Sequence, residues 1–252
     1  VMDFPYKSFF HKRMLKYNFK KADLIMATSK AIEDAISVIS AVKVERIPFG
    51  IDTEVFIPMN LKRSFGENSI VVGAIKSLET VYGIDLLIRA FKKVCDKHAQ
   101  LELKLFIVGG GSKEERLKSL VKELNLEQQV VFAGKVEYSN VVDYHNMIDI
   151  FVNVSRNESF GVSILEASSC GKPIVASDIG GLKEVVVNNE TGFLIESENV
   201  DAISDAIEKL VLDKNLRTEM GIKGRKFVKE QFEFSQNVND TIDSYKKLIS
   251  RS

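Results

Sequence analysis

Short apolar runs alternate with longer amphipathic segments along most of the chain. The apolar runs have the length of strands, and they predict strands at residues 69–75, 103–108, 129–133, 148–154, 173–177 and 192–195. Apolar positions spaced three and four residues apart predict helices at residues 83–98, 113–124, 139–146, 161–170, 200–213 and 215–230. Because strands and helices alternate, we expect an α/β fold with a doubly wound parallel sheet.

The start of the chain adds a smaller pattern. Before the sheet we expect a helix within residues 1–21, a strand at 22–27, a helix that follows Thr28 and Ser29, and a strand at 42–47. Residues 48–52 contain Pro48 and Gly50 and predict a turn or linker.

The composition is that of an ordinary α/β protein, with 45% apolar and 28% charged residues in a chain of 252. The formal net charge of zero argues against nucleic-acid binding, and the longest apolar runs are too short to span a membrane. Cys95 and Cys170 fit no metal-binding spacing, which indicates reduced thiols in a cytosolic protein. No signal peptide is visible, and a start at Val1 suggests a fragment or a processed product.

Residues 1–21 are basic and aromatic, with six Lys or Arg against one acid, Asp3. A basic helix of this kind can lie on an anionic membrane surface. The alternative is a helix that packs on a domain outside this chain. The alternative is favoured, because the apolar residues do not form one continuous stripe.

One predicted strand-loop-helix-strand unit carries two carboxylates, Glu158 in the loop and Glu166 in the helix. The loop lies at the carboxyl edge of the predicted sheet, where open α/β sheets bind ligands. The helix start at Phe160, Gly161 and Val162 offers backbone N–H groups to an anion. A carboxylate suits a sugar or ribose diol, since two hydroxyl donors can meet its two oxygens. These features predict a nucleotide-sugar site.

Plainer explanations stay open for the same residues. Glu158 could cap the helix, and Glu166 could lie exposed on the surface, because acids gather at helix starts. The glycines after the second strand of the sheet could approach a ligand or could make only a tight turn. They are not a dinucleotide fingerprint, because Glu114 stands where a third spaced glycine is needed. The histidines lie in no motif and are predicted to be solvated: His11, His98 and His145.

The string ESFGVSILEASSCGKPIVASDIGG resembles the E-x7-E region of retaining glycosyltransferases of the GT-B fold, most closely family 4, the glycosyl transferases group 1. The strings ADLIMATSKAIEDAI and IPFGIDTEVFIP resemble the end of the amino-terminal GT-B domain and the interdomain linker. The resemblance implies a remnant of the amino-terminal acceptor domain at 1–47. It also implies a Rossmann-like donor-binding domain at 48–230 and a crossover segment at 231–252, in which residues 234–249 form the last helix.

The resemblance also assigns roles. Glu158, the candidate catalytic residue, would hold hydroxyls of the donor sugar, and Glu166 would hold the ribose. The remaining donor-binding candidates are the backbone around the helix start and the segment after the third strand of the sheet: Ser159, Phe160, Gly161, Val162, Gly134, Lys135 and Val136.

Lys76 stands at or near the position of an arginine that binds the donor diphosphate in the family. The lysine that the family places before the glycine at position 83 is absent here, and Val81 and Tyr82 occupy that place. Since lysine lacks the bidentate fork of arginine, diphosphate binding should be weaker or differently arranged. The alternative is that Lys76 is a plain surface lysine.

The implied function is transfer of a hexose from a nucleotide-diphosphate sugar to an acceptor hydroxyl with retention, in bacterial-type polysaccharide or glycoconjugate synthesis. No cofactor or metal is expected, and the implied partners are a nucleotide sugar and a carbohydrate or lipid-linked acceptor. The expected location is the cytoplasm, with peripheral contact at the inner face of the membrane as a further option. The alternatives are a non-catalytic nucleotide-sugar-binding fragment, inactive on its own, and a GT-B nucleotide-sugar epimerase.

Overall fold

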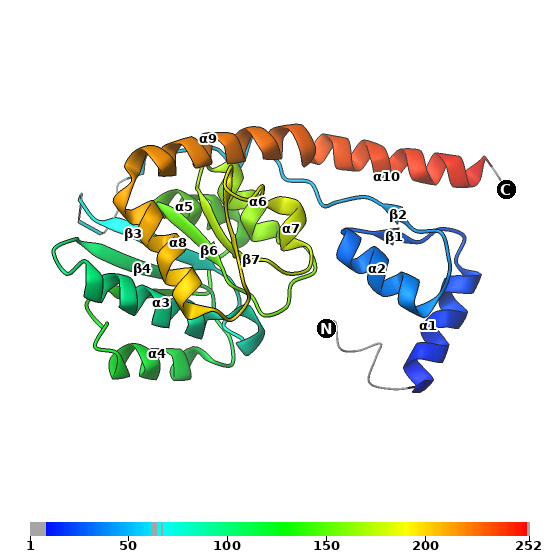
Figure 1. The fold of residues 1–252 in the computed structure, drawn as a ribbon. Helices are drawn as coiled ribbons and strands as arrows, with labels where there is room; N and C mark the ends of the chain where they lie inside the picture. The colour runs from blue at the N-terminus through cyan, green and yellow to red at the C-terminus, as the bar shows by residue number, and fades with distance from the viewer. Residues whose placement is uncertain (1–8, 62–64, 67, 251–252) are drawn as a thin grey trace.

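A computed structural model of the chain describes residues 9–61, 65–66 and 68–250. A parallel sheet of six strands forms the larger part of the molecule (Figure 1), in the order β5-β4-β3-β6-β7-β8. The strands are β3 (Ile70–Ile75), β4 (Leu103–Val108), β5 (Val130–Gly134), β6 (Ile150–Asn153), β7 (Ile174–Ser177) and β8 (Gly192–Ile195). The predicted α/β class and the predicted strands of this sheet are therefore confirmed.

Helices cover both faces of the sheet. Alternate residues of β3 separate the two layers, because Val72 belongs to one buried cluster and Val71 to the other. The first layer is α3 (Ile84–Lys97), α4 (Glu114–Glu123) and α8 (Val200–Leu212). The second layer is α5 (Val141–Met147), α6 (Val162–Ser169), α7 (Leu182–Val185) and the end of α9 (Lys214–Gln231).

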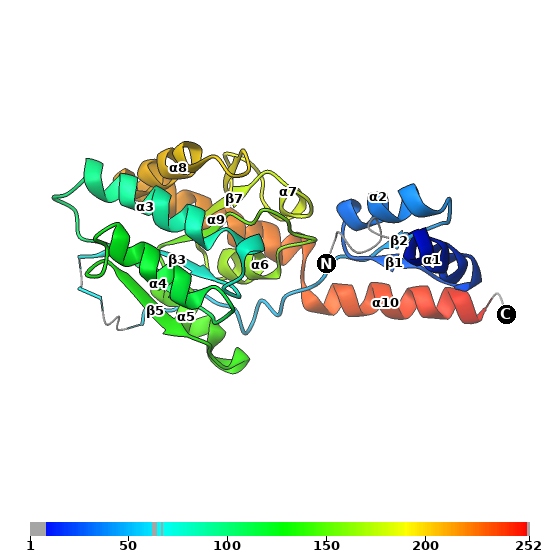
Figure 2. The ribbon, with the colours of Figure 1, turned by 90° about the horizontal axis from the view of Figure 1, so that it is seen from below.

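A smaller part of the molecule lies beside the sheet domain (Figures 1 and 2) and contains α1 (Phe9–Lys21), β1 (Met26–Ala27), α2 (Lys30–Ile39) and β2 (Glu45–Arg46). The predicted strands 22–27 and 42–47 are too long. β1 and β2 pair only with each other, over two residue pairs, so the rest of each run has no partner strand. The prediction for residues 1–8 falls outside the described residues.

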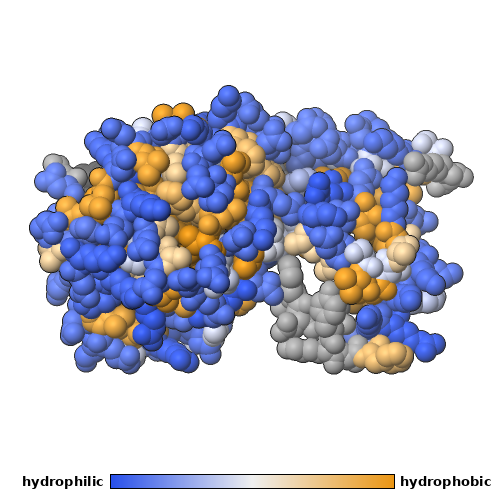
Figure 3. All heavy atoms as spheres, in the orientation of Figure 1, coloured by the Kyte–Doolittle hydropathy of each residue, from blue (hydrophilic) through white to orange (hydrophobic). Residues whose placement is uncertain are grey.

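Helix α10 (Phe234–Ile249) has the predicted bounds and runs from the end of α9 alongside the smaller part. There the Ser244 hydroxyl donates to Glu45 Oε1 at 2.6 Å. Apolar side chains are exposed on the smaller part (Figure 3), including Phe9, Phe10 and Tyr17 of α1, which has no buried residue. None of the helices in the described residues is both long and apolar enough to cross a membrane. The domain boundaries expected from the resemblance stay a prediction.

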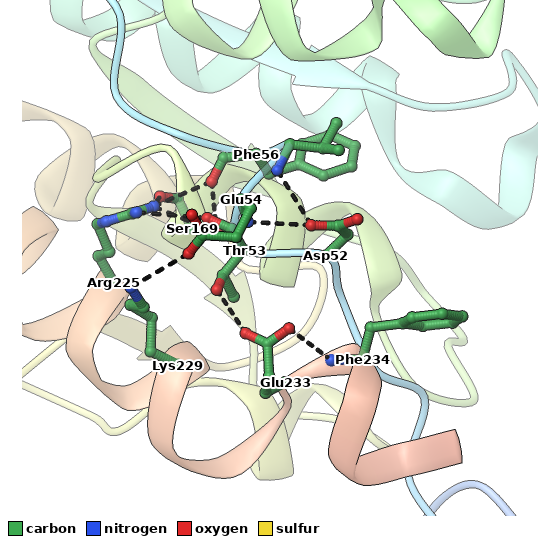
Figure 4. A network of polar contacts seen from close by, with 10 residues as sticks. Asp52, Thr53, Glu54, Phe56, Ser169, Arg225, Lys229, Glu233 and Phe234 are labelled. Carbon is green, nitrogen blue, oxygen red and sulfur yellow. Dashed lines mark hydrogen bonds and ion pairs between the residues drawn. The ribbon is translucent and has the colours of Figure 1, made fainter. Parts of the chain in front are cut away.

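Arg225 of α9 fixes the linker to the sheet domain (Figure 4). Its guanidinium donates to the backbone carbonyl oxygens of Phe56 at 3.0 Å and Thr53 at 3.3 Å, and to that of Ser169 in α6. The Thr53 hydroxyl in turn donates to Glu233, which precedes α10. The linker also pairs with the junction of α9 and α10, since Ile51 N donates to Phe232 O at 2.7 Å. One arginine therefore joins the linker, α6 and α9.

Arg156, in the loop after β6, joins the two loops that border the predicted site. Its guanidinium makes paired hydrogen bonds to both carboxylate oxygens of Asp85 at 2.8 Å. It also donates to Thr80 O at 2.6 Å, in the short helix η1 (Thr80–Tyr82), and to Glu198 at 2.8 Å. Bidentate pairs of this kind fix geometry as well as supply energy. Arg156 therefore holds the loop of Glu158 against the chain that follows β3.

We expect Arg225→Met to lower the free energy of unfolding by about 2 kcal/mol, because charge-assisted hydrogen bonds to buried carbonyl groups are lost. Urea denaturation monitored by circular dichroism measures the change. The control is Lys226→Met on the same helix, whose side chain is 74% exposed. The control should change stability by no more than about 0.5 kcal/mol. Equal effects of the two substitutions would contradict the role assigned to Arg225.

We also expect the stabilisation from Arg156 to be lost in acid. Burial alone would raise the pKa of Asp85, but the hydrogen bonds and charge of Arg156 outweigh burial and hold that pKa below its usual value. Stability from the pair is thus present above about pH 4, the range of an unfolded aspartate, and disappears as the pH falls through the lower folded pKa.

Urea midpoints of the wild type and of Arg156→Met, measured from pH 7 to pH 3, test this expectation. The difference between the two proteins should shrink below about pH 4. Asp85→Asn serves as the matched control, because it removes the titrating group and keeps the arginine. If the difference in urea midpoint between the two proteins stays constant from pH 7 to pH 3, the ion pair between Arg156 and Asp85 does not contribute the stability that is lost in acid.

Candidate functional site

The site lies where the strand order of the sheet reverses. From β3 the chain continues to β4 and β5 on one side, while β6, β7 and β8 lie on the other side. The carboxyl ends of β3 and β6 are therefore adjacent, and the loops that follow them diverge. Open α/β sheets form their ligand crevice at this point. Lys76 follows β3 directly, and Glu158 lies in the loop after β6.

Lys76 and Glu158 form an ion pair across this reversal. Lys76 Nζ lies 2.5 Å from Glu158 Oε2, and their side chains are 16% and 13% exposed. The ammonium also lies 4.9 Å from the ring centroid of Tyr82, within the range of a cation–π contact. Ser155 Oγ is 3.2 Å from the same carboxylate oxygen. The alternative of a plain surface lysine is therefore wrong.

The start of α6 is free of a side-chain cap. Gly161 precedes the helix with a φ of +113°, and no side chain accepts a hydrogen bond at this end. Glu158 consequently does not cap the helix, and that alternative is also wrong. The Phe160 side chain is buried against Phe49 and Phe232, so only its backbone can serve a ligand. Ser159 and Val162 flank this backbone and are partly exposed.

Two glycines after β7 support the loop of Glu158. A Cβ atom on Gly180 would lie 2.1 Å from Glu158 O, and one on Gly181 would lie 2.3 Å from Ser159 O. Gly181 N donates to Glu158 O at 3.3 Å. Any larger residue at these positions would push the loop away from the sheet. The two glycines therefore allow the loop of Glu158 to pack closely against the turn that follows β7.

Glu166 of α6 is buried, with 5% of its surface exposed, so the alternative of an exposed Glu166 is wrong. Its Oε2 atom lies 3.1 Å from Nε2 of His145 in α5. His145 is fully buried, and the prediction that it is solvated is also wrong. Burial lowers the pKa of His145 despite the neighbouring carboxylate, so the imidazole is neutral at physiological pH.

Sequence reasoning missed His145, although a signal was present. Val141, His145 and Ile148 are spaced by four and three residues, and all three are buried. This spacing predicts one inward helix face. His98 is not free in solvent either, because its Nε2 atom lies 2.6 Å from Glu208 Oε1.

The segment after β5 approaches Glu166 through Tyr138. Gly134 ends β5 with a φ of +74°, and Lys135 and Val136 follow it toward η2 (Tyr138–Asn140). Burial raises the pKa of Tyr138, and the nearby Glu166 carboxylate raises it further. Tyr138 itself is 66% exposed. Tyr138, in the segment after β5, therefore lies close to Glu166.

The backbone of the loop after β3 lies against the glycines that follow β4. A Cβ atom on Gly109 would lie 1.9 Å from Lys76 O, and one on Gly111 would lie 2.5 Å from Leu78 O. Close packing of the two loops thus requires these glycines, as the tight-turn explanation states. A cavity of about 460 Å³ lies nearby between α3 and α4. Its lining includes Glu79, Thr80 and Lys113, and it contains none of the predicted site residues.

The described residues contain no group of three or more His, Cys, Asp or Glu side chains able to hold a metal ion. Burial raises the pKa of Cys170 to about 12 and that of Cys95 to about 11. Both thiols are therefore protonated and unreactive at neutral pH. Lys76, the two carboxylates and the backbone of the α6 start are the candidates for the chemistry of the site.

Comparison with curated proteins gives relatives that act on sugars. The chain is 29% identical over 226 residues to N-acetyl-alpha-D-glucosaminyl L-malate synthase of Bacillus anthracis, which covers 87% of this chain and 58% of that protein. It is 34% identical over 213 residues to D-inositol 3-phosphate glycosyltransferase of Corynebacterium jeikeium, covering 79% of this chain and 51% of that protein. The chain spans about half the length of the curated relatives it matches.

Solved structures agree on the fold. Sucrose-phosphate synthase from Thermosynechococcus elongatus matches with a TM-score of 0.88 and 25% identity, over 100% of this chain and 66% of that chain. The Anabaena protein HepE, solved with UDP and glucose, matches with a TM-score of 0.85 and 20% identity, over 98% of this chain and 70% of that chain. The model of the family described as glycosyl transferases group 1 matches residues 60–227. The chain belongs to the glycosyl transferases group 1 family and has the GT-B fold.

Proposed function

We propose that this chain is the donor-binding half of a retaining, family 4 glycosyltransferase that moves a hexose from a nucleotide-diphosphate sugar to an acceptor hydroxyl. The observation that carries the proposal is the Lys76–Glu158 ion pair at the strand-order reversal, beside the uncapped start of α6. A cation, a helix start and a carboxylate are the groups that a sugar diphosphate needs.

The diphosphate would take the place of Glu158 as the partner of Lys76. In the free chain the Lys76 charge is balanced by a carboxylate at 2.5 Å. A bound diphosphate offers the ammonium more negative charge and also meets the N–H groups of Ser159, Phe160, Gly161 and Val162. Glu158 would then be released to accept hydrogen bonds from the donor-sugar hydroxyls. Binding thus exchanges one ion pair for another, with little net desolvation of the lysine.

The nucleoside would lie toward α5. In this arrangement Glu166 accepts hydrogen bonds from the ribose hydroxyls, and the backbone of Gly134, Lys135 and Val136 contacts the base. The support is the approach of Tyr138 to Glu166, which brings the segment after β5 to the same place. No metal is needed in this proposal, because Lys76 and the helix start offset the diphosphate charge.

The acceptor, proposed to be a carbohydrate or a lipid-linked sugar in polysaccharide or glycoconjugate synthesis, would bind on the part of the enzyme that this chain does not include. One relative, D-inositol 3-phosphate glycosyltransferase, is named for transfer to a polyol phosphate. Because the chain spans about half of such relatives, we infer that it binds donor without useful transfer by itself.

Two kinds of contact are proposed for helix α1, one with the rest of the amino-terminal domain and one with a membrane surface. It combines exposed Phe9, Phe10 and Tyr17 with five basic residues, Lys12, Arg13, Lys16, Lys20 and Lys21, and no acid. In the proposed cytoplasmic enzyme this surface packs against the rest of the amino-terminal domain. Peripheral contact with an anionic membrane would use the same residues.

Calorimetry in the presence of EDTA tests the proposed donor binding. We expect one or more of UDP-, GDP- and ADP-sugars to bind with unchanged affinity after chelation, since the charge is balanced by Lys76 and the α6 start. Lys76→Met should weaken that binding about tenfold, and Lys113→Met, at the beginning of α4, is the matched control. Binding that disappears with the chelator would contradict the metal-free arrangement.

A second experiment should distinguish the roles of the Glu158 and Glu166 carboxylates. Glu166→Gln should weaken the free nucleoside diphosphate and the nucleotide sugar equally, by about tenfold, because both contain the ribose. Glu158→Gln should leave the free nucleoside diphosphate bound at least as well and weaken the nucleotide sugar by a similar factor. The ratio of the two dissociation constants for each variant is the measurement. Identical ratios in wild type and in both variants would refute the assignment.

A further inference from the structure

His145 occupies a position that packing alone does not explain. Its ring is fully buried, between the ring of Phe151 at 5.2 Å and that of Phe56 at 6.1 Å, measured between centroids. Its Nε2 atom lies 3.1 Å from Glu166 Oε2. Its Nδ1 atom is buried with no hydrogen-bond partner among the described residues. An apolar side chain would fill this space without leaving a buried nitrogen unpaired.

The contacts fix the tautomer of His145. A carboxylate can only accept, so the proton must be on Nε2, and the unpaired Nδ1 has no acceptor toward which it could donate. Burial, and to a lesser extent the charge of Lys172, lowers the pKa of the ring, which keeps the imidazole neutral. The histidine therefore directs a single N–H at Glu166 and brings no positive charge that would cancel the carboxylate.

The direction of this hydrogen bond matters for what Glu166 can do. His145 reaches the carboxylate from α5, on the buried side, while the exposed Tyr138 lies toward solvent. The hydrogen bond from His145 to Oε2 of Glu166 restricts the rotation of the carboxylate group about its last bond. A diol recognises a carboxylate through both oxygens and is sensitive to that rotation.

We propose that His145 is a positioning residue that orients Glu166 for bidentate recognition of the ribose diol. The inference rests on the proposed role of Glu166 and adds a residue to the proposed site. The part of the ligand that His145 affects is the pair of ribose hydroxyls, and the phosphates and base should be indifferent to it.

The test compares UDP, GDP or ADP, whichever binds, with its 2′,3′-dideoxy counterpart by calorimetry. His145→Leu removes the N–H and should weaken the ribonucleotide about tenfold, with less than about a twofold change for the dideoxynucleotide. His145→Gln places an amide N–H near the position of Nε2 and should restore the ribonucleotide affinity to within about threefold of wild type. In the Glu166→Gln background, His145→Leu should have no further effect on either nucleotide.

The matched control is Val141→Ala, one turn earlier on the buried face of α5. It should lower the free energy of unfolding without changing the ratio of ribonucleotide to dideoxynucleotide affinity. A loss in His145→Leu that is equal for both nucleotides, or no loss in a folded variant, would overturn the proposal. If His145→Leu does not fold, failure of folded His145→Gln to keep the wild-type preference for the ribonucleotide would overturn it.

The single variant Glu166→Gln separates this proposal from the one on which it rests. Equal losses for both nucleotides in Glu166→Gln would remove the ribose assignment, and the role of His145 with it. A loss confined to the ribonucleotide in Glu166→Gln, with none in His145→Leu, would leave the proposed function standing and overturn only the inference about His145.

Discussion

The ion pair between Lys76 and Glu158 is the constraint on which the rest of the site depends. It exists because β3 and β6 are neighbours in space although the chain separates them by two strands and three α-helices. Both groups are mostly withdrawn from water, so removing either partner would leave a charge without compensation. The glycines at 109, 180 and 181 and the contacts of Arg156 can each be understood as keeping the two loops at this separation.

Most strands and helices of the sheet domain could be predicted from the sequence, because the spacing of apolar residues within each segment determines its secondary structure. The apolar run Ile70–Ile75 is a strand in any sheet that buries both faces, whereas the bounds of α10 were implied by the resemblance. The predicted bounds are wrong where the length of a strand depends on pairing with a neighbouring strand. The run at 22–27 has strand character throughout, but only Met26 and Ala27 meet β2. The short helices η1 and α7 have no amphipathic period and were not predicted.

The site divides in the same way. The positions of Glu158, Glu166 and Lys76 followed from the loop and strand pattern and from the resemblance, while the residues that hold them did not. Arg156 depends on Asp85 and Glu198, and Glu166 depends on His145, which are distant in the sequence. Neither the sign of a residue's charge nor its helix face identifies a partner that only the tertiary fold brings near. Periodicity could show that His145 lies on the inward face of its helix, but it could not show that the Glu166 carboxylate lies beside the imidazole.

The distribution of contacts also determines where the two parts of the molecule can move. The segment from Thr53 to Phe56 is fixed to the sheet domain by Arg225, and polar contacts join the sheet domain to the smaller part. They include Glu184 of α7 with Lys30 N at 2.8 Å and with Arg46 at 3.7 Å. Polar contacts of this kind oppose relative motion less than an apolar core does. A change in angle between the parts would thus be absorbed before Thr53 and at the junction of α9 and α10, and it would leave the geometry of Lys76 and Glu158 intact.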